Sequence, residues 1–176
     1  MNNQFDRQQY ELPNGKKIFH LNDYETDFLY HEIFNNEVYV QHGIQINEGD
    51  VIFDVGANIG LFSLYVKQKC PQCTIYAFEP RPSIYPILKQ NLQGFADTVK
   101  TYQYGLSDNE EQKTLVYYPG YSVISGFHTN VKRDVDIIAS GMKASEEASA
   151  GCKINSQREL EIHQLVSARL ATSYSY

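Results

Sequence analysis

Tryptophan, long apolar runs and a surplus of basic charge are all missing from this chain of 176 residues. No apolar run approaches the roughly 20 residues that span a bilayer, and the N-terminus lacks the basic start and apolar core of a signal peptide. Fifteen Lys and Arg against 21 Asp and Glu give a formal net charge of -6, so no overall positive field gathers phosphate backbones. We therefore expect a cytoplasmic protein that binds neither membrane nor nucleic acid.

Cysteine is scarce as well. Cys70, Cys73 and Cys152 are too few and too unevenly spaced for a disulfide framework, which agrees with a reducing compartment. The Cys70-Pro71-Gln72-Cys73 segment invites a redox or zinc interpretation. Reactive pairs stand at helix N-termini, however, whereas these cysteines follow a predicted helix, and no second pair supplies the other ligands of tetrahedral zinc. We predict no metal site.

Residues 1–50 are predicted to form a small cover, made of a hairpin and a helix, over the core of the domain. Residues 10–19 are typical of a hairpin, because Leu12-Pro13-Asn14-Gly15 is turn chemistry between two segments that can extend. A helix is predicted over residues 22–34, with Asn22 as its N-cap. Residues 51–176 are expected to form the core, with a flexible insertion at about residues 139–152.

From residue 51 the chain alternates between strand and helix patterns. Strands are predicted at residues 51–55, 74–78 and 99–106, and helices after Gly60 and after Pro82, the second ended by a left-handed Gly94. Strand, helix, strand, helix and strand give a parallel sheet with right-handed crossovers. Further on, a strand is expected at residues 113–118, a loop at 118–126, and a helix from residue 156 that stops near Ser173.

A nucleotide-type cofactor site is predicted where the first strand ends. Asp54 is followed by Gly56, Ala57, Asn58 and Gly60, small residues that leave backbone N–H groups exposed near a helix N-terminus. Glu79, about twenty residues on at the tip of the next strand, is placed to accept from ribose hydroxyls. Taken alone, Asp54 is as readily explained as a strand-end cap.

A dinucleotide site is the first alternative for this turn. Counted from Gly56, the pattern G-x-G-x-x-G would need glycine at Asn58 and Leu61, and it fails at both positions. Asparagine is the residue other than glycine that best tolerates left-handed geometry. The spacing therefore disfavours a nicotinamide-dependent oxidoreductase.

Three motifs carry a resemblance to a known family. Asp54-Val55-Gly56-Ala57-Asn58-Ile59-Gly60 followed by Ala77-Phe78-Glu79-Pro80 resembles S-adenosylmethionine-dependent methyltransferases of the FkbM type, and Gly105-Leu106-Ser107-Asp108 resembles that family's third-strand motif. The flanking segments at residues 25–29, 39–44, 117–119 and 125–127 are similar to methyltransferase domains of polyketide and nonribosomal peptide synthases. The resemblance covers roughly residues 10 to 130.

The resemblance implies a Rossmann-like class I methyltransferase sheet, a three-layer α/β/α fold, that binds S-adenosylmethionine and releases S-adenosylhomocysteine. It implies that Asp54 and the turn from Gly56 to Gly60 hold the methionine end. Glu79, with Pro80 in the same motif, would hold the ribose, and Leu106 with Ser107 the adenine edge.

Methyl transfer to an alcohol would use a positioned base, and histidine suits that role near neutral pH. His42, just before the first core strand, is our candidate, and His128 is the second. A structural or surface histidine is the simpler interpretation of both. We expect the acceptor to be a small molecule with a hydroxyl group, of polyketide, peptide or sugar-like type and carrier-bound in a larger synthase; a homo-oligomer is the other assembly considered.

The second half of the family's fold has no counterpart here. A complete sheet of this kind has seven strands, and its later Lys-Ile-Asp-x-Glu-Gly type motif is only faintly echoed by Val135-Asp136-Ile137-Ile138. We therefore expect a domain truncated in its C-terminal half. The alternative function is a non-catalytic fragment that binds the cofactor or another protein.

Overall fold

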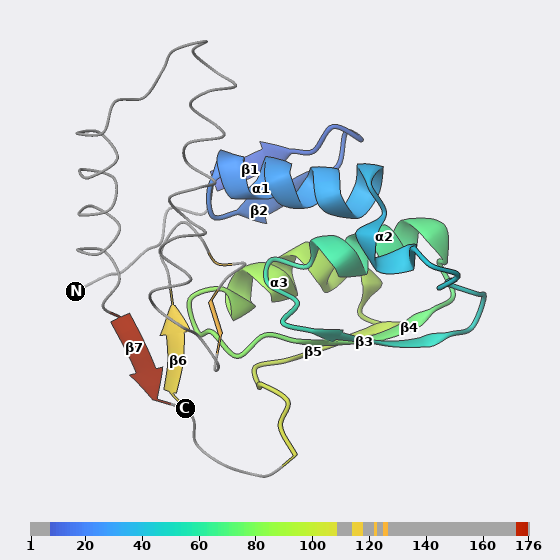
Figure 1. The fold of residues 1–176 in the computed structure, drawn as a ribbon. Coiled ribbons are helices and arrows are strands. Elements are labelled where there is room, and N and C mark those ends of the chain that lie inside the picture. The colour runs from blue at the N-terminus through green and yellow to red at the C-terminus, as the bar shows by residue number, and fades with distance from the viewer. Residues whose placement is uncertain (1–7, 109–113, 118–121, 123–124, 127–171, 176) are drawn as a thin grey trace. The chain divides into compact units, whose positions relative to one another are not determined.

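The computed structural model describes residues 8–108, 114–117, 122, 125–126 and 172–175. The chain forms two compact units, Met1–Asn109 and Glu110–Tyr176, which are described one at a time (Figure 1). The predicted insertion, the predicted helix from residue 156 as far as residue 171, and the segment Val135 to Ile138 lie outside the described residues. Within the described part, no helix is long and apolar enough to cross a membrane.

The first unit begins with the predicted hairpin. Strand β1 (Gln8–Glu11) pairs antiparallel with β2 (Lys17–His20), and the turn between them is closed by the Leu12 N–H, which donates to the Lys16 carbonyl at 2.9 Å. Gly15 takes a φ of 81° there, a left-handed conformation that glycine adopts without strain. The hairpin prediction is confirmed.

The predicted first helix is confirmed as α1 (Asp23–Tyr30). Its N-cap is Asn22, whose side chain accepts from the Glu25 N–H at 2.8 Å, satisfying a donor that the first helical turn leaves without an intrahelical partner. The helix continues as a π-helical turn, η1 (His31–Asn35), and a 3-10 turn follows, η2 (Val38–Val40).

A parallel three-stranded sheet forms the centre of this unit, as predicted. Its order is β3 (Val51–Val55), β4 (Thr74–Phe78) and β5 (Val99–Tyr102). Helices α2 (Leu61–Lys69) and α3 (Tyr85–Leu92) connect the strands and lie over the same face of the sheet (Figure 1). Sequential parallel strands with right-handed crossovers place both helices on one side.

The two faces of the sheet differ in burial. Ile75 and Ala77 of β4 are 0% exposed on the face that the helices cover, whereas Val51, Phe53 and Val55 of β3 are 60%, 59% and 58% exposed on the other. Within the described residues the sheet and its helices make two layers. The third layer of the expected α/β/α arrangement stays a prediction.

Two predicted boundaries are wrong. Gly94 does not end its helix in a left-handed conformation: it lies inside a 3-10 turn, η3 (Gln93–Phe95), which continues the right-handed path and is followed by a Thr98 N–H to Phe95 carbonyl bond of 3.0 Å. Strand β5 ends at Tyr102 rather than at Leu106. Tyr102 is the last residue of β5 that pairs with β4, opposite Phe78.

The second unit contains an antiparallel pair. Strand β6 (Thr114–Tyr117) lies within the predicted strand at residues 113–118 and pairs with β7 (Thr172–Ser175). Val116 and Gly126 exchange two further backbone hydrogen bonds of 3.0 Å each. Strand β7 corrects the end of the helix that was predicted to stop near Ser173, because Thr172 and Ser173 belong to the strand. Thr and Tyr favour strands, but the partner is far away in sequence.

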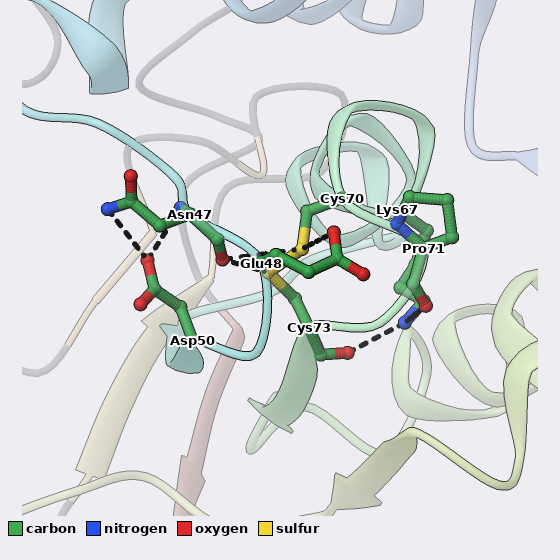
Figure 2. The surroundings of a disulfide bond; sticks show 7 residues. All are labelled: Asn47, Glu48, Asp50, Lys67, Cys70, Pro71 and Cys73. Atoms are coloured by element: carbon green, nitrogen blue, oxygen red, sulfur yellow. Dashed lines mark hydrogen bonds between the residues drawn. A yellow bond between two sulfur atoms is a disulfide. The ribbon is translucent and has the colours of Figure 1, made fainter.

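A disulfide joins Cys70 and Cys73 (Figure 2). It closes the turn between α2 and β4, with the two Cα atoms 5.5 Å apart and both residues buried. The Lys67 ammonium donates to the carbonyls of Pro71 and Cys73 at 2.6 and 2.7 Å, which fixes the same turn. The bond corrects the expectation of unpaired cysteines: the framework argument concerned the cysteine count, whereas a tight turn alone brings this pair within bonding range.

Candidate functional site

The carboxyl ends of the three parallel strands meet at one edge of the sheet. Val55 pairs with Phe78 and Phe78 with Tyr102, and the Glu79 N–H donates to the Tyr102 carbonyl at 3.0 Å. This register aligns the segments that follow β3, β4 and β5, which is where open α/β sheets bind ligands. The candidate site is therefore this edge, and it gathers Asp54, the Gly56 to Gly60 turn and Glu79.

Asp54 is a buried carboxylate on the helix-covered face of β3, and only 7% of it is exposed. The Ser63 hydroxyl donates to it at 2.6 Å. Burial raises the pKa of the Asp54 carboxyl to about 6; the hydrogen bonds from the Ser63 side chain and backbone lower the pKa, and the charge of Glu79 raises it. Ser63 thus fixes a carboxylate that is mostly ionised just above neutral pH.

The turn after β3 has the left-handed geometry that its sequence predicts. Gly56, Asn58 and Gly60 have φ values of 77°, 50° and 92°. The N–H groups of Gly56 and Ala57 both donate to the Phe78 carbonyl at 2.9 Å, which anchors the turn to β4. A Cβ atom built on Gly56 would meet nothing within 4 Å, so the backbone at Gly56 borders open space that a ligand can enter.

Gly60, unlike Gly56, faces neighbouring side chains and not open space. A Cβ atom at this position would lie 2.9 Å from Leu88 Cδ1, so any side chain at residue 60 would require Leu88 of α3 to shift. The Asn91 amide donates to the Ile59 carbonyl at 2.8 Å and to the Phe19 carbonyl at 2.9 Å. These contacts tie the turn to α3 and to the N-terminal hairpin.

Glu79 is fully buried and connects two turns of the site. Its Oε1 accepts from the backbone N–H and the Nε of Arg81, at 3.0 and 2.6 Å. Its Oε2 accepts from the Asn58 N–H at 2.9 Å and from Arg81 Nη2 at 3.0 Å. The carboxylate thus holds the turn after β3 and the turn after β4 together, and four donors occupy its acceptor positions.

The remaining predicted site residues lie in different surroundings. Pro80 is buried beside Glu79, whereas Leu106 is 49% exposed and Ser107 is exposed, in the irregular segment after β5. His42 lies in an exposed turn between η2 and β3 with a φ of 56°. The structure does not show it hydrogen-bonded to Asp54 or Glu79, and His128 lies outside the described residues.

Two site residues, Ser63 and Arg81, were not predicted. Ser63 stands in the first turn of α2 and reaches back to the end of β3; a small hydroxyl residue after the second glycine of the turn was the available signal. Arg81 stands two residues after Glu79, where a basic residue next to a predicted buried acid could have been paired with it. Each of them donates a hydrogen bond to one of the predicted carboxylates, Ser63 to Asp54 and Arg81 to Glu79.

No protein-family model matches the chain, but several characterised proteins do. It is 47% identical over 116 residues to the AMB antimetabolite synthetase AmbE of Pseudomonas aeruginosa. It is 40% identical over 117 residues to the 31-O-demethyl-FK506 methyltransferase FkbM of Streptomyces tacrolimicus, and 37% identical over 132 residues to the methyltransferase sdnD of Sordaria araneosa. The chain is a relative of the FkbM-type methyltransferases. The family resemblance predicted from its motifs is thereby confirmed.

The matches cover more of this chain than of its relatives. They take in 66%, 66% and 72% of the chain but 6% of AmbE, 45% of FkbM and 50% of sdnD. The chain thus spans about half the length of the two methyltransferases and a small part of the synthetase.

Proposed function

We propose that this FkbM-type chain binds S-adenosylmethionine and transfers its methyl group to a hydroxyl of a small-molecule acceptor, releasing S-adenosylhomocysteine. The observation that carries the proposal is the open backbone at Gly56 beside the buried, ionisable Asp54, at the carboxyl edge of a parallel sheet. Relatives named as methyltransferases support the reaction class.

The residues of this edge fit such a cofactor. Asp54 and the turn through Gly56, Ala57, Asn58 and Gly60 would hold its methionine end, because an anionic carboxylate attracts the positive charges there. Glu79 and Pro80 would hold the ribose, and Leu106 with Ser107 the adenine edge. When bound, the cofactor supplies a methyl group on a positively charged sulfur, and the chain contributes alignment and exclusion of water.

Two relatives and one exposed histidine support the acceptor side of the reaction. The name of FkbM specifies a 31-O-demethyl substrate, which supports oxygen as the acceptor atom. His42 is the proposed base, and its exposed turn leaves the imidazole free to meet an acceptor from solvent. The relation to a synthetase supports a carrier-bound acceptor within a larger assembly.

Binding and transfer are tested in sequence. Calorimetric titration with S-adenosylhomocysteine is expected to show binding to the wild-type chain and at least a tenfold loss in Asp54→Asn, since about 1.4 kcal/mol of charge interaction corresponds to that factor. Asp97→Asn, which removes an exposed carboxylate from the loop before β5, is the matched control and should bind normally. Equal affinities in all three proteins would refute the assigned site.

A non-catalytic cofactor-binding fragment is the second candidate, favoured by the half-length match to the relatives. Incubation with methyl-labelled S-adenosylmethionine and a panel of hydroxylated polyketide, peptide and sugar acceptors separates the two. Labelled product that disappears in Asp54→Asn supports the transferase. Tight binding of S-adenosylhomocysteine with no product from any acceptor supports the fragment.

A further inference from the structure

Protein donors occupy the acceptor positions of Glu79 in this structure, so a ribose would have to replace some of them. The residue is 0% exposed, and a carboxylate offers about four acceptor positions. Two are taken by backbone N–H groups, those of Asn58 and Arg81. The other two are taken by Nε and Nη2 of the Arg81 side chain. Two vicinal ribose hydroxyls would need two of these positions.

The four contacts differ in how easily they can be given up. The Asn58 and Arg81 N–H groups are held by the turns that carry them, which are anchored to Phe78 and to α3. The guanidinium ends a long, buried side chain with several rotatable bonds, so it can move without a change in the backbone. It presents two parallel donors to the two carboxylate oxygens, and a ribose diol likewise presents two neighbouring O–H donors. The side chain of Arg81 is therefore the group that a ribose can replace.

We propose that Arg81 occupies the position on Glu79 that the ribose hydroxyls of the cofactor take, so that Arg81 sets the affinity and the ribose selectivity of the site. This inference rests on the proposed function. It makes Arg81 a positioning residue that acts through Glu79: the guanidinium neutralises and orients the buried carboxylate, and binding of the cofactor separates the pair.

The test compares two ligands in five proteins. S-adenosylhomocysteine and its 3′-deoxy analogue are titrated into wild type, Arg81→Gln, Arg81→Lys and Glu79→Gln, with Lys89→Gln, an exposed cation on α3, as the matched loss of one positive charge. Arg81→Gln is expected to bind S-adenosylhomocysteine about tenfold more tightly, because a charge-assisted contact no longer has to be broken. The analogue, which lacks one hydroxyl, should gain less.

Arg81→Lys should fall between wild type and Arg81→Gln, since an ammonium keeps the charge but cannot bind both oxygens in parallel. It also decides the matter should Arg81→Gln fail to fold. Glu79→Gln should lose most of the preference for S-adenosylhomocysteine over the analogue. Lys89→Gln should match wild type with both ligands.

Three outcomes overturn the inference. Weaker binding of both ligands by the same factor in the Arg81 variants, together with lower melting temperatures, would make Arg81 structural only. Unchanged ligand preference in Glu79→Gln, with wild type still binding, would remove Glu79 from the ribose while leaving the proposed function intact. Failure of every protein to bind S-adenosylhomocysteine would overturn both the proposed function and the inference.

Discussion

The same three strands build two faces of one sheet, and the faces differ in almost every respect. On the covered face, Ile75 and Ala77 are fully buried, and Asp54 is held by Ser63 of α2. On the open face, Phe53 stacks on Tyr76 and Phe78, with ring centroids 5.4 and 6.0 Å apart, and Phe78 stacks on Tyr102 at 5.1 Å. Open-face rings contact one another, whereas the covered face contacts helices.

The difference shows where the stability and the chemistry of the unit lie. Burial of apolar area stabilises by roughly 25 cal/mol per Å², and the covered face provides that burial. The carboxylates that face the helices acquire fixed partners, and Asp54 acquires a raised pKa. Substitutions on the two faces should therefore have very different effects, and the following experiments measure that difference.

The largest effect is expected at the centre of the covered face. Ile75→Ala should lower the free energy of unfolding by about 3 kcal/mol, because it removes a buried side chain and leaves a cavity against the helices. Urea denaturation followed by circular dichroism measures it. A loss below about 1 kcal/mol would mean that the covered face is not the core.

A second effect concerns the pH dependence of stability. The folded pKa of Asp54 is about 6 against an ordinary 3.8, so the folded state binds more protons than the unfolded state between pH 4 and 6, and stability falls as pH rises through that window. Above pH 6 the full penalty, about 3 kcal/mol, is present. Asp54→Asn should therefore be more stable than wild type at pH 7.5 by up to this amount, and should lose the advantage at pH 4.

Urea unfolding at the two pH values measures this change, with Asp97→Asn as the control that should follow wild type. An Asp54→Asn variant that is equally or less stable at pH 7.5 would show that the buried charge costs nothing in the folded chain.

A smaller effect is expected from the residue that holds Asp54. Ser63 is 0% exposed, and Ser63→Ala removes a hydrogen bond to a charged group, which costs about 2 kcal/mol at pH 7.5. Because the Ser63 hydrogen bonds lower the pKa of Asp54, the variant should also titrate Asp54 at higher pH. Carbon-detected NMR titration of the carboxyl measures the shift. An unchanged titration midpoint would show that Ser63 does not hydrogen-bond to the Asp54 carboxylate in solution.

The smallest effect is expected on the open face. Phe53 is 59% exposed, so Phe53→Ala should cost less than about 1 kcal/mol, the part that its ring stacking contributes. The same denaturation experiment measures it. A cost equal to that of Ile75→Ala would show that the open face is buried in solution and would remove the contrast between the two faces.

Much of the first unit could be predicted because its signals are local. The strand at Thr74–Phe78 has the predicted bounds, the Asn22 cap forms as predicted, and the left-handed turn follows from Gly56, Asn58 and Gly60. Asp54 and Glu79 reach the same edge of the sheet because parallel strands align their ends. Spacing and turn chemistry carry this information.

The rest could not be predicted because it depends on contacts between distant segments. The pairing of β6 with β7 joins residues 114–117 to residues 172–175, and no local pattern specifies that register. The partners of the two carboxylates, Ser63 and Arg81, become visible only when side-chain directions are known. The exposure of one face of the sheet could not be predicted either. Val, Ile and Phe run continuously through β3, and such a run indicates burial on both sides.

The most direct test of the site compares two glycines. Gly56 and Gly49 have φ values of 77° and 82°, and a Cβ atom at either would meet nothing within 4 Å, so alanine should cost both similar stability, about 1 kcal/mol. Only Gly56 borders the site. We predict that Gly56→Ala loses at least tenfold in affinity for S-adenosylhomocysteine while Gly49→Ala binds like wild type; equal affinity in the two variants would contradict the assignment of the site.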